Sequence, residues 1–318
     1  MNTIFAMIVK RLVLGILTIL VISLFIFVGV EALPGDLAEA VLGQNATAET
    51  VAAFRKELKL DLPPHVRYFT WLGNFMQGDL GTSLANHRPI ADQIIWRFGN
   101  TIFLAAVAAV IAVPLAILLG IIAALYRNSL FDRFISITTL STISFPDFFI
   151  AYILVALFSV QMVWFPSMAT INAEMSFWEK IYTVTLPCIT LSMVVMAHMM
   201  RQTRAAIINV LSSPFIEMAT LKGLKRFRII VLHAFPNALS PVINIVAINL
   251  AFLVTGVVII EVVFVYPGLG QLFVDAVSKR DLPLVQASGL IFAVTYVALN
   301  LLADVLSIIC NPRLRNPK

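Results

Sequence analysis

The sequence predicts an all-α protein that crosses a membrane six times. Its 318 residues are 60% hydrophobic and only 12% charged, whereas a soluble domain carries about 25% charged residues. The mean hydropathy is +0.95. Uncharged runs recur at the length of about 20 residues that a helix needs to cross the roughly 30 Å of bilayer hydrocarbon. These runs are far too long for the strands of a transmembrane barrel.

The first apolar run is expected to stay in the mature protein as a membrane span. It follows Lys10 and Arg11 and holds 19 uncharged residues, Leu12 to Val30. A secretory signal peptide has a shorter apolar core of about 7–15 residues and a small-residue cleavage site. The predicted spans lie at about 12–31, 99–125, 134–162, 181–200, 239–263 and 284–309.

The distribution of basic residues predicts that both termini lie in the cytoplasm. With the N-terminus inside, the two short outer loops hold only Lys180, Lys279 and Arg280. Most other Lys and Arg residues then fall on the inner side, as they do in membrane proteins generally. Residues 1–318 are therefore expected to form a single transmembrane domain.

Residues 32–98 are predicted to form a long segment on the outer side. Thr47 to Leu60 reads as a short amphipathic helix, with the Thr47 hydroxyl as its N-terminal cap. Leu62-Pro63-Pro64 should end that helix because proline cannot continue it. Gly78-Asp79-Leu80-Gly81 has the composition of a turn.

Residues 201–236 are predicted to form a structured loop on the cytoplasmic side. Ser213 and Pro214 suit a helix start, with a capping hydroxyl followed by proline at the first helical position. Glu217 falls in the first turn, and Gly223 suits a bend about two turns later. Such an exposed helix can lie on anionic lipid or dock a soluble partner.

The order of residues in this loop resembles the EAA loop of ABC importer permeases. Glu217-Met218-Ala219 is followed after three residues by Gly223, and after nine more by His233-Ala234-Phe235-Pro236. The pattern of those permeases is Glu-Ala-Ala, three residues, Gly, nine residues and Ile-x-Leu-Pro. The chain departs from it at Met218, His233 and Phe235.

Motifs along the whole chain, in order, resemble the dipeptide/oligopeptide/nickel permease family of ABC importers. A histidine at the place of His233 is usual in this branch. The motifs are Leu33-Pro34-Gly35-Asp36, Gly78-Asp79-Leu80-Gly81-Thr82-Ser83, Arg201-Gln202-Thr203-Arg204, Lys222-Gly223-Leu224, Pro236-Asn237-Ala238, Glu261-Val262-Val263-Phe264, Tyr266-Pro267-Gly268-Leu269-Gly270, Arg280-Asp281, Pro283-Leu284-Val285-Gln286, Asn300, Asp304 and Asn311-Pro312-Arg313.

The resemblance implies a type I ABC importer fold in the inner membrane of a bacterium. The chain would be the first of two homologous permeases that pair as a heterodimer. Two ATPase subunits would bind inside, and a solute-binding protein would deliver the cargo outside. Residues 215–226 would be the coupling helix held in a groove of an ATPase. The residues implied in coupling are Phe215, Glu217, Ala219, Lys222, Gly223, Leu224 and Arg226.

The chain itself is not expected to be an enzyme or to bind a cofactor. It has no Gly-x-x-x-x-Gly-Lys-Ser/Thr loop for ATP phosphates, so ATP and magnesium would bind to the partner ATPases. Cys188 and Cys310 sit in apolar stretches without the clustered Cys and His of a metal site. No motif indicates nucleic acid.

Polar residues inside the predicted spans are candidates for the transport pathway. Asp147 follows Pro146 deep in the third span, where a broken helix can line a pathway, and Asn244 and Asn249 can line it or bond between helices. Asp304 is expected to make a structural bond. His198 is expected to be a packed or interfacial residue.

Arg201 and Arg204 lie one helical turn apart and have two readings. They either anchor the inner side of the membrane or form a salt bridge that braces the 201–236 loop.

Two other classes of protein remain as alternatives. An ion-coupled secondary transporter would need a charge relay within the spans and no docking loop. An intramembrane enzyme would need paired acids or a nucleophile with its base, and no such set is evident. The sequence does not name the cargo, which in the resembling family is a dipeptide, a longer peptide, a nickel complex or a sugar.

Overall fold

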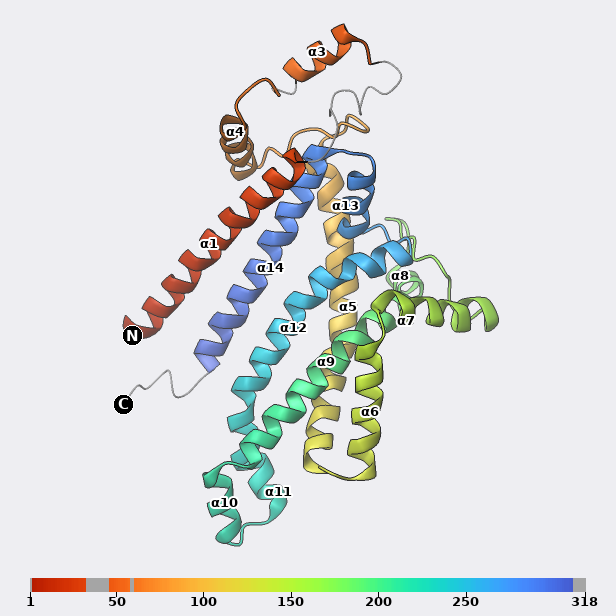
Figure 1. Ribbon diagram of the computed structural model, residues 1–318. Coiled ribbons are helices and arrows are strands. Elements are labelled where there is room, and N and C mark those ends of the chain that lie inside the picture. The colour runs from red at the N-terminus through yellow and green to blue at the C-terminus, as the bar shows by residue number, and fades with distance from the viewer. Residues whose placement is uncertain (1, 33–45, 58–59, 311–318) are drawn as a thin grey trace. The chain divides into compact units, whose positions relative to one another are not determined.

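The computed structural model describes residues 2–32, 46–57 and 60–310, and these residues are helical or irregular apart from one bridge between Thr82 and Pro89. Figure 1 shows the helices. They are α1 (Asn2–Glu31), α3 (Ala48–Glu57), α4 (Pro64–Met76), α5 (Ile90–Leu125), α6 (Leu130–Ser144), α7 (Asp147–Leu154), η2 (Val155–Gln161), α8 (Phe177–Thr183), α9 (Thr185–Leu211), α10 (Pro214–Leu221), α11 (Arg226–Ile229), η3 (Ile230–Ala234), α12 (Phe235–Val263), α13 (Leu269–Ser278) and α14 (Leu282–Cys310).

The chain divides into two compact units. Unit 1 consists of residues 1–13, 102–266 and 298–318, and unit 2 of residues 14–101 and 267–297. The motifs Leu33-Pro34-Gly35-Asp36 and Asn311-Pro312-Arg313 lie outside the described residues.

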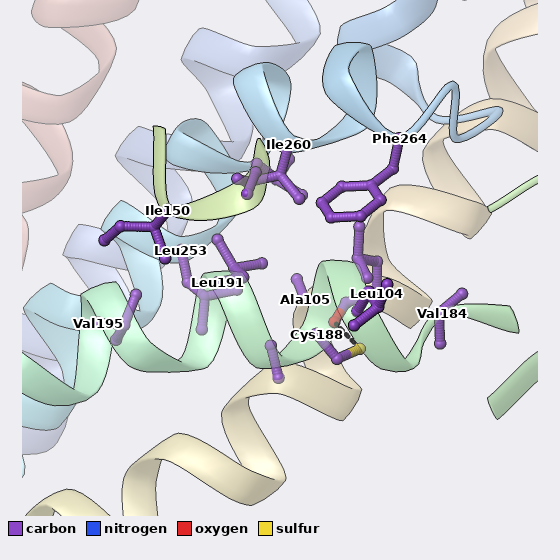
Figure 2. Close-up of a cluster of buried hydrophobic side chains, with 14 of the residues drawn as sticks. Leu104, Ala105, Ile150, Val184, Cys188, Leu191, Val195, Leu253, Ile260 and Phe264 are labelled. Carbon is purple, nitrogen blue, oxygen red and sulfur yellow. Dashed lines mark hydrogen bonds between the residues drawn. The ribbon is translucent and has the colours of Figure 1, made fainter. Parts of the chain in front are cut away.

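The core of unit 1 is built around α9. Figure 2 shows Leu191 and Val195 of α9 beside Leu104 of α5, Ile150 of α7 and Leu253 of α12. All five side chains are buried. Burial of each such side chain contributes about 1.5–3 kcal/mol when the alternative is water, but between lipid-embedded helices close packing takes over that role. The helices of unit 1 are therefore held mainly by how closely they fit α9.

Cys188 is one of the residues that fill this core. Its thiol lies 4.0 Å from the carbonyl oxygen of Leu104, and its side chain is buried and unbridged. The expectation that Cys188 is apolar filler is confirmed. The side chain of Cys310 lies outside the described part of the structure.

The third predicted span is bent rather than straight. Helices α6 and α7 meet at an angle of 104°, and η2 continues α7. The bend falls at Phe145 and Pro146, where Phe145 is extended (φ −93°, ψ 139°). Proline has no N–H for the helix and disfavours a helical residue before it. The broken helix considered at Pro146 and Asp147 within the predicted span 134–162 is present for that reason.

The fourth predicted span is also bent and ends later than expected. Helices α8 and α9 meet at 61°. Helix α9 continues to Leu211, so Arg201 and Arg204 belong to a helix and not to the loop that was expected from residue 201. Within the described part of the chain, four helices are long and apolar enough to cross a membrane alone, and the number is six if each bent pair forms one span.

The first and last spans meet at an ion pair inside unit 1. Arg11 Nη1 lies 2.7 Å from Asp304 Oδ2. The structural bond expected for Asp304 is thus confirmed, and it places the start of α1 beside the end of α14. The assignment of this end to the cytoplasm stays a prediction.

Unit 2 contains short helices that connect the spans. The N–H of Thr50 donates to Thr47 Oγ1 over 3.2 Å, which confirms Thr47 as the cap of α3. Helix α3 is described as far as Glu57, and residues 58–59 of the predicted helix lie outside the described residues. Helices α4 and α13 were not predicted, and Pro64, expected to end a helix, is the first residue of α4, a position that needs no N–H donor.

Asp281 joins two of the sequence motifs within unit 2. Its buried carboxylate accepts hydrogen bonds from the Ser83 hydroxyl, from the Leu84 N–H at 3.1 Å and from the Leu284 N–H at 3.4 Å. The donors at 83 and 84 follow the turn at Gly78 to Gly81, whose two glycines have positive φ. A buried carboxylate needs such donors to offset its lost hydration. The Asp281 carboxylate thus links the two motif segments through hydrogen bonds.

Gly120 of α5 lies close to the backbone of α9 in unit 1. A Cβ atom built at this position would lie 2.9 Å from the carbonyl oxygen of Met200 and 2.9 Å from Thr203 Cβ on α9. Backbone atoms cannot swing away as a flexible side chain can. A residue larger than glycine would therefore push α5 and α9 apart.

Replacement of Gly120 by alanine is expected to destabilise unit 1 by about 1–3 kcal/mol, since overpacking forces backbone shifts. Gly99→Ala in the same helix is the matched control, because a Cβ there meets no atom within 4 Å. That change should be neutral or stabilising by up to about 1 kcal/mol. Thermal unfolding of the purified protein in detergent measures both effects. Equal melting temperatures for the two variants would contradict the prediction.

Candidate docking site on helix α10

Helix α10 begins directly after α9 and has proline at its first position, as predicted. Ser213 precedes it with extended backbone angles (φ −78°, ψ 149°) but makes no side-chain cap. Its hydroxyl instead donates to the carbonyl oxygen of Val210, one turn back on α9. The expected capping role of Ser213 was therefore wrong, because the hydroxyl satisfies the end of the preceding helix. Glu217 lies in the first turn, where the helix dipole favours an acidic side chain.

Gly223 ends α10 in a Schellman motif. Its φ is +74°, in the left-handed region that glycine adopts without strain. The Gly223 N–H donates to the Thr220 carbonyl over 2.9 Å, and the Leu224 N–H donates to the Ala219 carbonyl over 3.3 Å. These are the two hydrogen bonds that define the motif. The sharp bend predicted at Gly223 is present, and its physical reason is this left-handed conformation.

One face of α10 packs against the rest of unit 1. Ile216 and Ala219 are buried in a cluster with Ile229 of α11 and Ala234 of η3. Leu224, just after the glycine, packs against the same cluster, a hydrophobic contact that commonly accompanies a Schellman motif. Of the predicted coupling residues, Ala219 and Leu224 thus point inward. They fix the position of the helix and do not form its surface.

Another face of α10 presents large, exposed apolar side chains. Phe215, Met218 and Leu221 recur at intervals of three residues and are 40%, 56% and 76% exposed. Together they form an apolar ridge, which is the name used below for these three residues. Such exposed apolar patches mark surfaces that bind a partner or a membrane.

Charged residues flank the apolar ridge. Glu217 and Lys222 are exposed on either side of it. The backbone of Arg226 starts α11, but its side chain lies outside the described part of the structure. Figure 1 shows α10 and α11 projecting beyond the ends of α9 and α12, where they are accessible.

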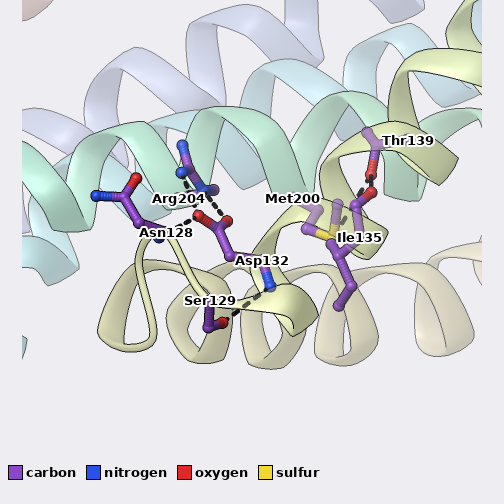
Figure 3. Close-up of polar contacts among 7 residues, drawn as sticks. All are labelled: Asn128, Ser129, Asp132, Ile135, Thr139, Met200 and Arg204. Atoms are coloured by element: carbon purple, nitrogen blue, oxygen red, sulfur yellow. Dashed lines mark hydrogen bonds and ion pairs between the residues drawn. The ribbon is translucent and has the colours of Figure 1, made fainter.

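A buried ion pair fixes α9 just before α10. Arg204 Nε donates to Asp132 Oδ1 over 2.7 Å, and Arg204 Nη2 donates to Asp132 Oδ2 over 2.8 Å. Figure 3 shows this bidentate pair between α9 and α6, with the Asn128 N–H also donating to Asp132 Oδ2 at 2.9 Å. The Asp132 carboxyl is buried. The backbone N–H of Asp132 donates to the Ser129 hydroxyl over 3.1 Å.

This ion pair decides between the two interpretations of the basic residues. Arg204 forms a bracing salt bridge, whereas Arg201 is exposed on the same helix. Asp132, the partner of Arg204, was not among the candidates named from the sequence. The two residues are 72 positions apart, and no local pattern connects them.

The end of α9 that precedes α10 also contacts α5 and α12. Ala124 of α5, Ile207 of α9 and Ala238 of α12 form a small buried cluster. Nearer the middle of α9, Asn249 of α12 donates its side-chain amide to Gln202 Oε1 over 3.1 Å. Helix α9, against whose end α10 packs, is therefore held to α12 by packed and hydrogen-bonded contacts.

The three pathway candidates occupy different environments. Asn249 is 6% exposed and bonds between helices, which is the second of its two interpretations. Asn244 is partly exposed on α12. Asp147 is the first residue of α7 at the 104° bend and is partly exposed, as expected for a broken helix.

Comparison with known proteins identifies relatives along the whole chain. The family described as "Binding-protein-dependent transport system inner membrane component" matches residues 116–316, and its N-terminal component matches residues 4–105. The chain is 37% identical to the "Glutathione transport system permease protein GsiC" of Escherichia coli (strain K12) and of Shigella dysenteriae, over 97% of this chain and 98% of each relative. The corresponding protein of Salmonella paratyphi A is 36% identical over the same shares.

Loss of the Arg204 guanidinium is expected to destabilise the protein by about 3–5 kcal/mol, since it leaves a buried carboxylate unpaired. Arg204→Met makes this change, and Arg201→Met is the matched control three residues away on an exposed face. Asp132→Asn added to Arg204→Met should recover part of the loss, because it removes the unpaired charge. Thermal unfolding in detergent measures all three. A similar effect of both single variants would contradict the bracing role.

Proposed function

The chain belongs to the family of binding-protein-dependent transport system inner membrane components, so it is a permease subunit of an ABC importer, and we propose that α10 is the element through which ATPase subunits move it. The chain is a multi-pass protein of the bacterial inner membrane and has the type I ABC importer fold. It is a transport subunit and not an enzyme.

Importers of this family work with a second permease, ATPase subunits and a binding protein. The family favours this ATP-driven mode over the ion-coupled transporter considered from sequence. We propose that the second permease is a homologue that pairs with this chain as a heterodimer. ATP and magnesium would bind only to the two ATPase subunits on the inner side.

The apolar ridge supports a docking role for α10. Helix-in-groove recognition uses apolar side chains on one face of a short helix, laid into a groove of the partner. Phe215, Met218 and Leu221 have this arrangement, and Glu217 and Lys222 flank it with charges of both signs. A helix that binds anionic lipid instead carries mainly basic residues on its polar face. The acidic Glu217 beside the ridge favours a protein partner.

The attachment of α10 gives a route for force from the docking surface to the spans. The Schellman motif and the cluster of Ile216, Ala219 and Ile229 keep α10 and α11 together. A displacement of α10 therefore moves the end of α9 and the start of α12. The pair of Arg204 and Asp132 carries the displacement to α6.

We place the transport pathway beside the polar residues that are not fully enclosed. Asp147 at the helix bend and Asn244 on α12 are both partly exposed within unit 1. Asn249 would act mainly by keeping α12 on α9 through Gln202. Polar groups inside a membrane face protein or water, so exposed ones indicate a water-filled passage.

Short peptides, glutathione among them, are the proposed cargo. Relatives that match 97% of the chain are named for glutathione transport, and the sequence motifs resemble peptide permeases. Neither observation selects one peptide, because the binding protein makes the first selection in such importers.

Leu221→Asp is expected to abolish ATP-dependent uptake of labelled glutathione or a labelled dipeptide by the complex in proteoliposomes, because it places a charge on the apolar ridge. The exposed position, 76% accessible, means that the permease should still fold. Leu130→Asp is the matched control, since this leucine is 82% exposed at the start of α6. Co-purification of ATPase subunits should fall only for Leu221→Asp. Normal uptake by that variant would rule out the docking role.

Gly223→Val is expected to uncouple ATP hydrolysis from uptake. A β-branched residue strains the left-handed conformation at φ +74°, at a cost of about 1–2 kcal/mol or more, so α10 loses its fixed angle while its ridge remains. Gly223→Asn is the control because asparagine tolerates this conformation. The assay compares ATPase activity with uptake in the same proteoliposomes. Full uptake with valine at 223 would contradict the proposal.

A further inference from the structure

Helix α4 has an unusual composition for a segment on the watery side of a membrane. Among its 13 residues are four aromatic ones, Tyr68, Phe69, Trp71 and Phe75, and none of its side chains is fully buried. Tyrosine and tryptophan concentrate where lipid meets water, because their rings are apolar and their polar atoms reach the headgroups.

Helix α4 packs against the apolar part of α1. The Tyr68 hydroxyl lies 2.8 Å from the Ser23 hydroxyl, and the Phe27 ring lies 5.5 Å from that of Tyr68 and 6.2 Å from that of Trp71. Ser23 is completely buried by this contact. The Ser23 hydroxyl also donates to the Leu20 carbonyl oxygen over 2.8 Å, so it is bonded on both α1 and α4.

The positions contacted on α1 fix the depth of α4. Ser23 and Phe27 lie eight and four residues before Glu31, which corresponds to about 12 Å and 6 Å along a helix. The uncharged run of α1 has 19 residues, or about 28 Å, barely enough for the roughly 30 Å hydrocarbon layer. Nearly all of that run must lie in hydrocarbon, including Ser23 and Phe27. Helix α4 therefore lies at the level of lipid chains and headgroups.

The face of α4 that turns away from α1 is suited to lipid. Phe69 and Met76 are 68% and 80% exposed, lie seven residues apart and share one side with exposed Val66. Thr70 and Asn74 are exposed four residues apart on another side. A helix of this kind has a wide apolar face and a narrow polar one, as helices in the plane of the membrane interface do.

We infer that α4 is an interfacial helix whose side chains Val66, Phe69 and Met76 insert into the lipid layer at the C-terminal end of α1. The ion pair between Arg67 and Glu31 ties it to the end of the span, and Figure 1 shows α4 beside that end. This assignment places α4, a part of the predicted outer segment 32–98, against lipid and not against water. It is independent of the cargo and of the docking role of α10.

Spin-label accessibility in the assembled importer tests the assignment. A background with Cys188→Ala and Cys310→Ala accepts one cysteine at a time, Phe69→Cys or Met76→Cys on the apolar side and Thr70→Cys or Asn74→Cys on the polar side. Each variant is labelled with a nitroxide and assembled with its partner subunits, made free of reactive cysteines, in lipid nanodiscs. Collision with oxygen reports lipid, and collision with a water-soluble nickel chelate reports water.

Labels at 69 and 76 should show a several-fold higher ratio of oxygen to nickel collisions than labels at 70 and 74. A high nickel accessibility at 69 and 76 would overturn the proposal and return α4 to a water-facing surface. Protection of 69 and 76 from both reagents would also overturn it, since it would mean that protein, such as the second permease, covers this face. The labelled positions are exposed, so folding is not at risk.

Discussion

Close packing around α9 is the constraint on which unit 1 depends. Helices in a membrane gain little from hiding apolar surface from lipid, so their contacts rely on fit and on a few polar bonds. Gly120 lets α5 approach the backbone of α9, Arg204 holds α6, and Gln202 bonds Asn249 of α12. These three contacts use residues 200–204 of α9, the helix that precedes the one we assign to docking.

The arrangement of α10 follows from that constraint. A docking helix can transmit force only if it is rigidly attached to the helices beside it. Ile216 and Ala219 point inward and pack α10 against the end of α9 and the residues that lead into α12. The apolar ridge stays exposed on the other side of α10. The same eight residues therefore supply a packed face and an exposed apolar face.

Unit 2 uses a different polar contact for a similar purpose. Asp281 lies directly before α14, and its buried carboxylate accepts hydrogen bonds from residues 83 and 84. The Asn100 side chain donates to the Pro267 carbonyl, and Thr101 Oγ1 accepts from the Leu269 N–H, each over 2.8 Å. The sequence motifs that suggested the family are thus mainly structural in this unit, because they join segments far apart in the chain.

The sequence by itself determined the features that depend on local chemistry. Apolar run length indicated the spans, Pro214 and Gly223 located both ends of α10, and Thr47 capped α3. Only the tertiary structure decided which residues meet. The partner of Arg204, the inward direction of Ala219 and the contact of α4 with α1 each depend on segments distant in sequence. Local patterns set backbone conformation, whereas contacts between helices depend on how the whole chain packs.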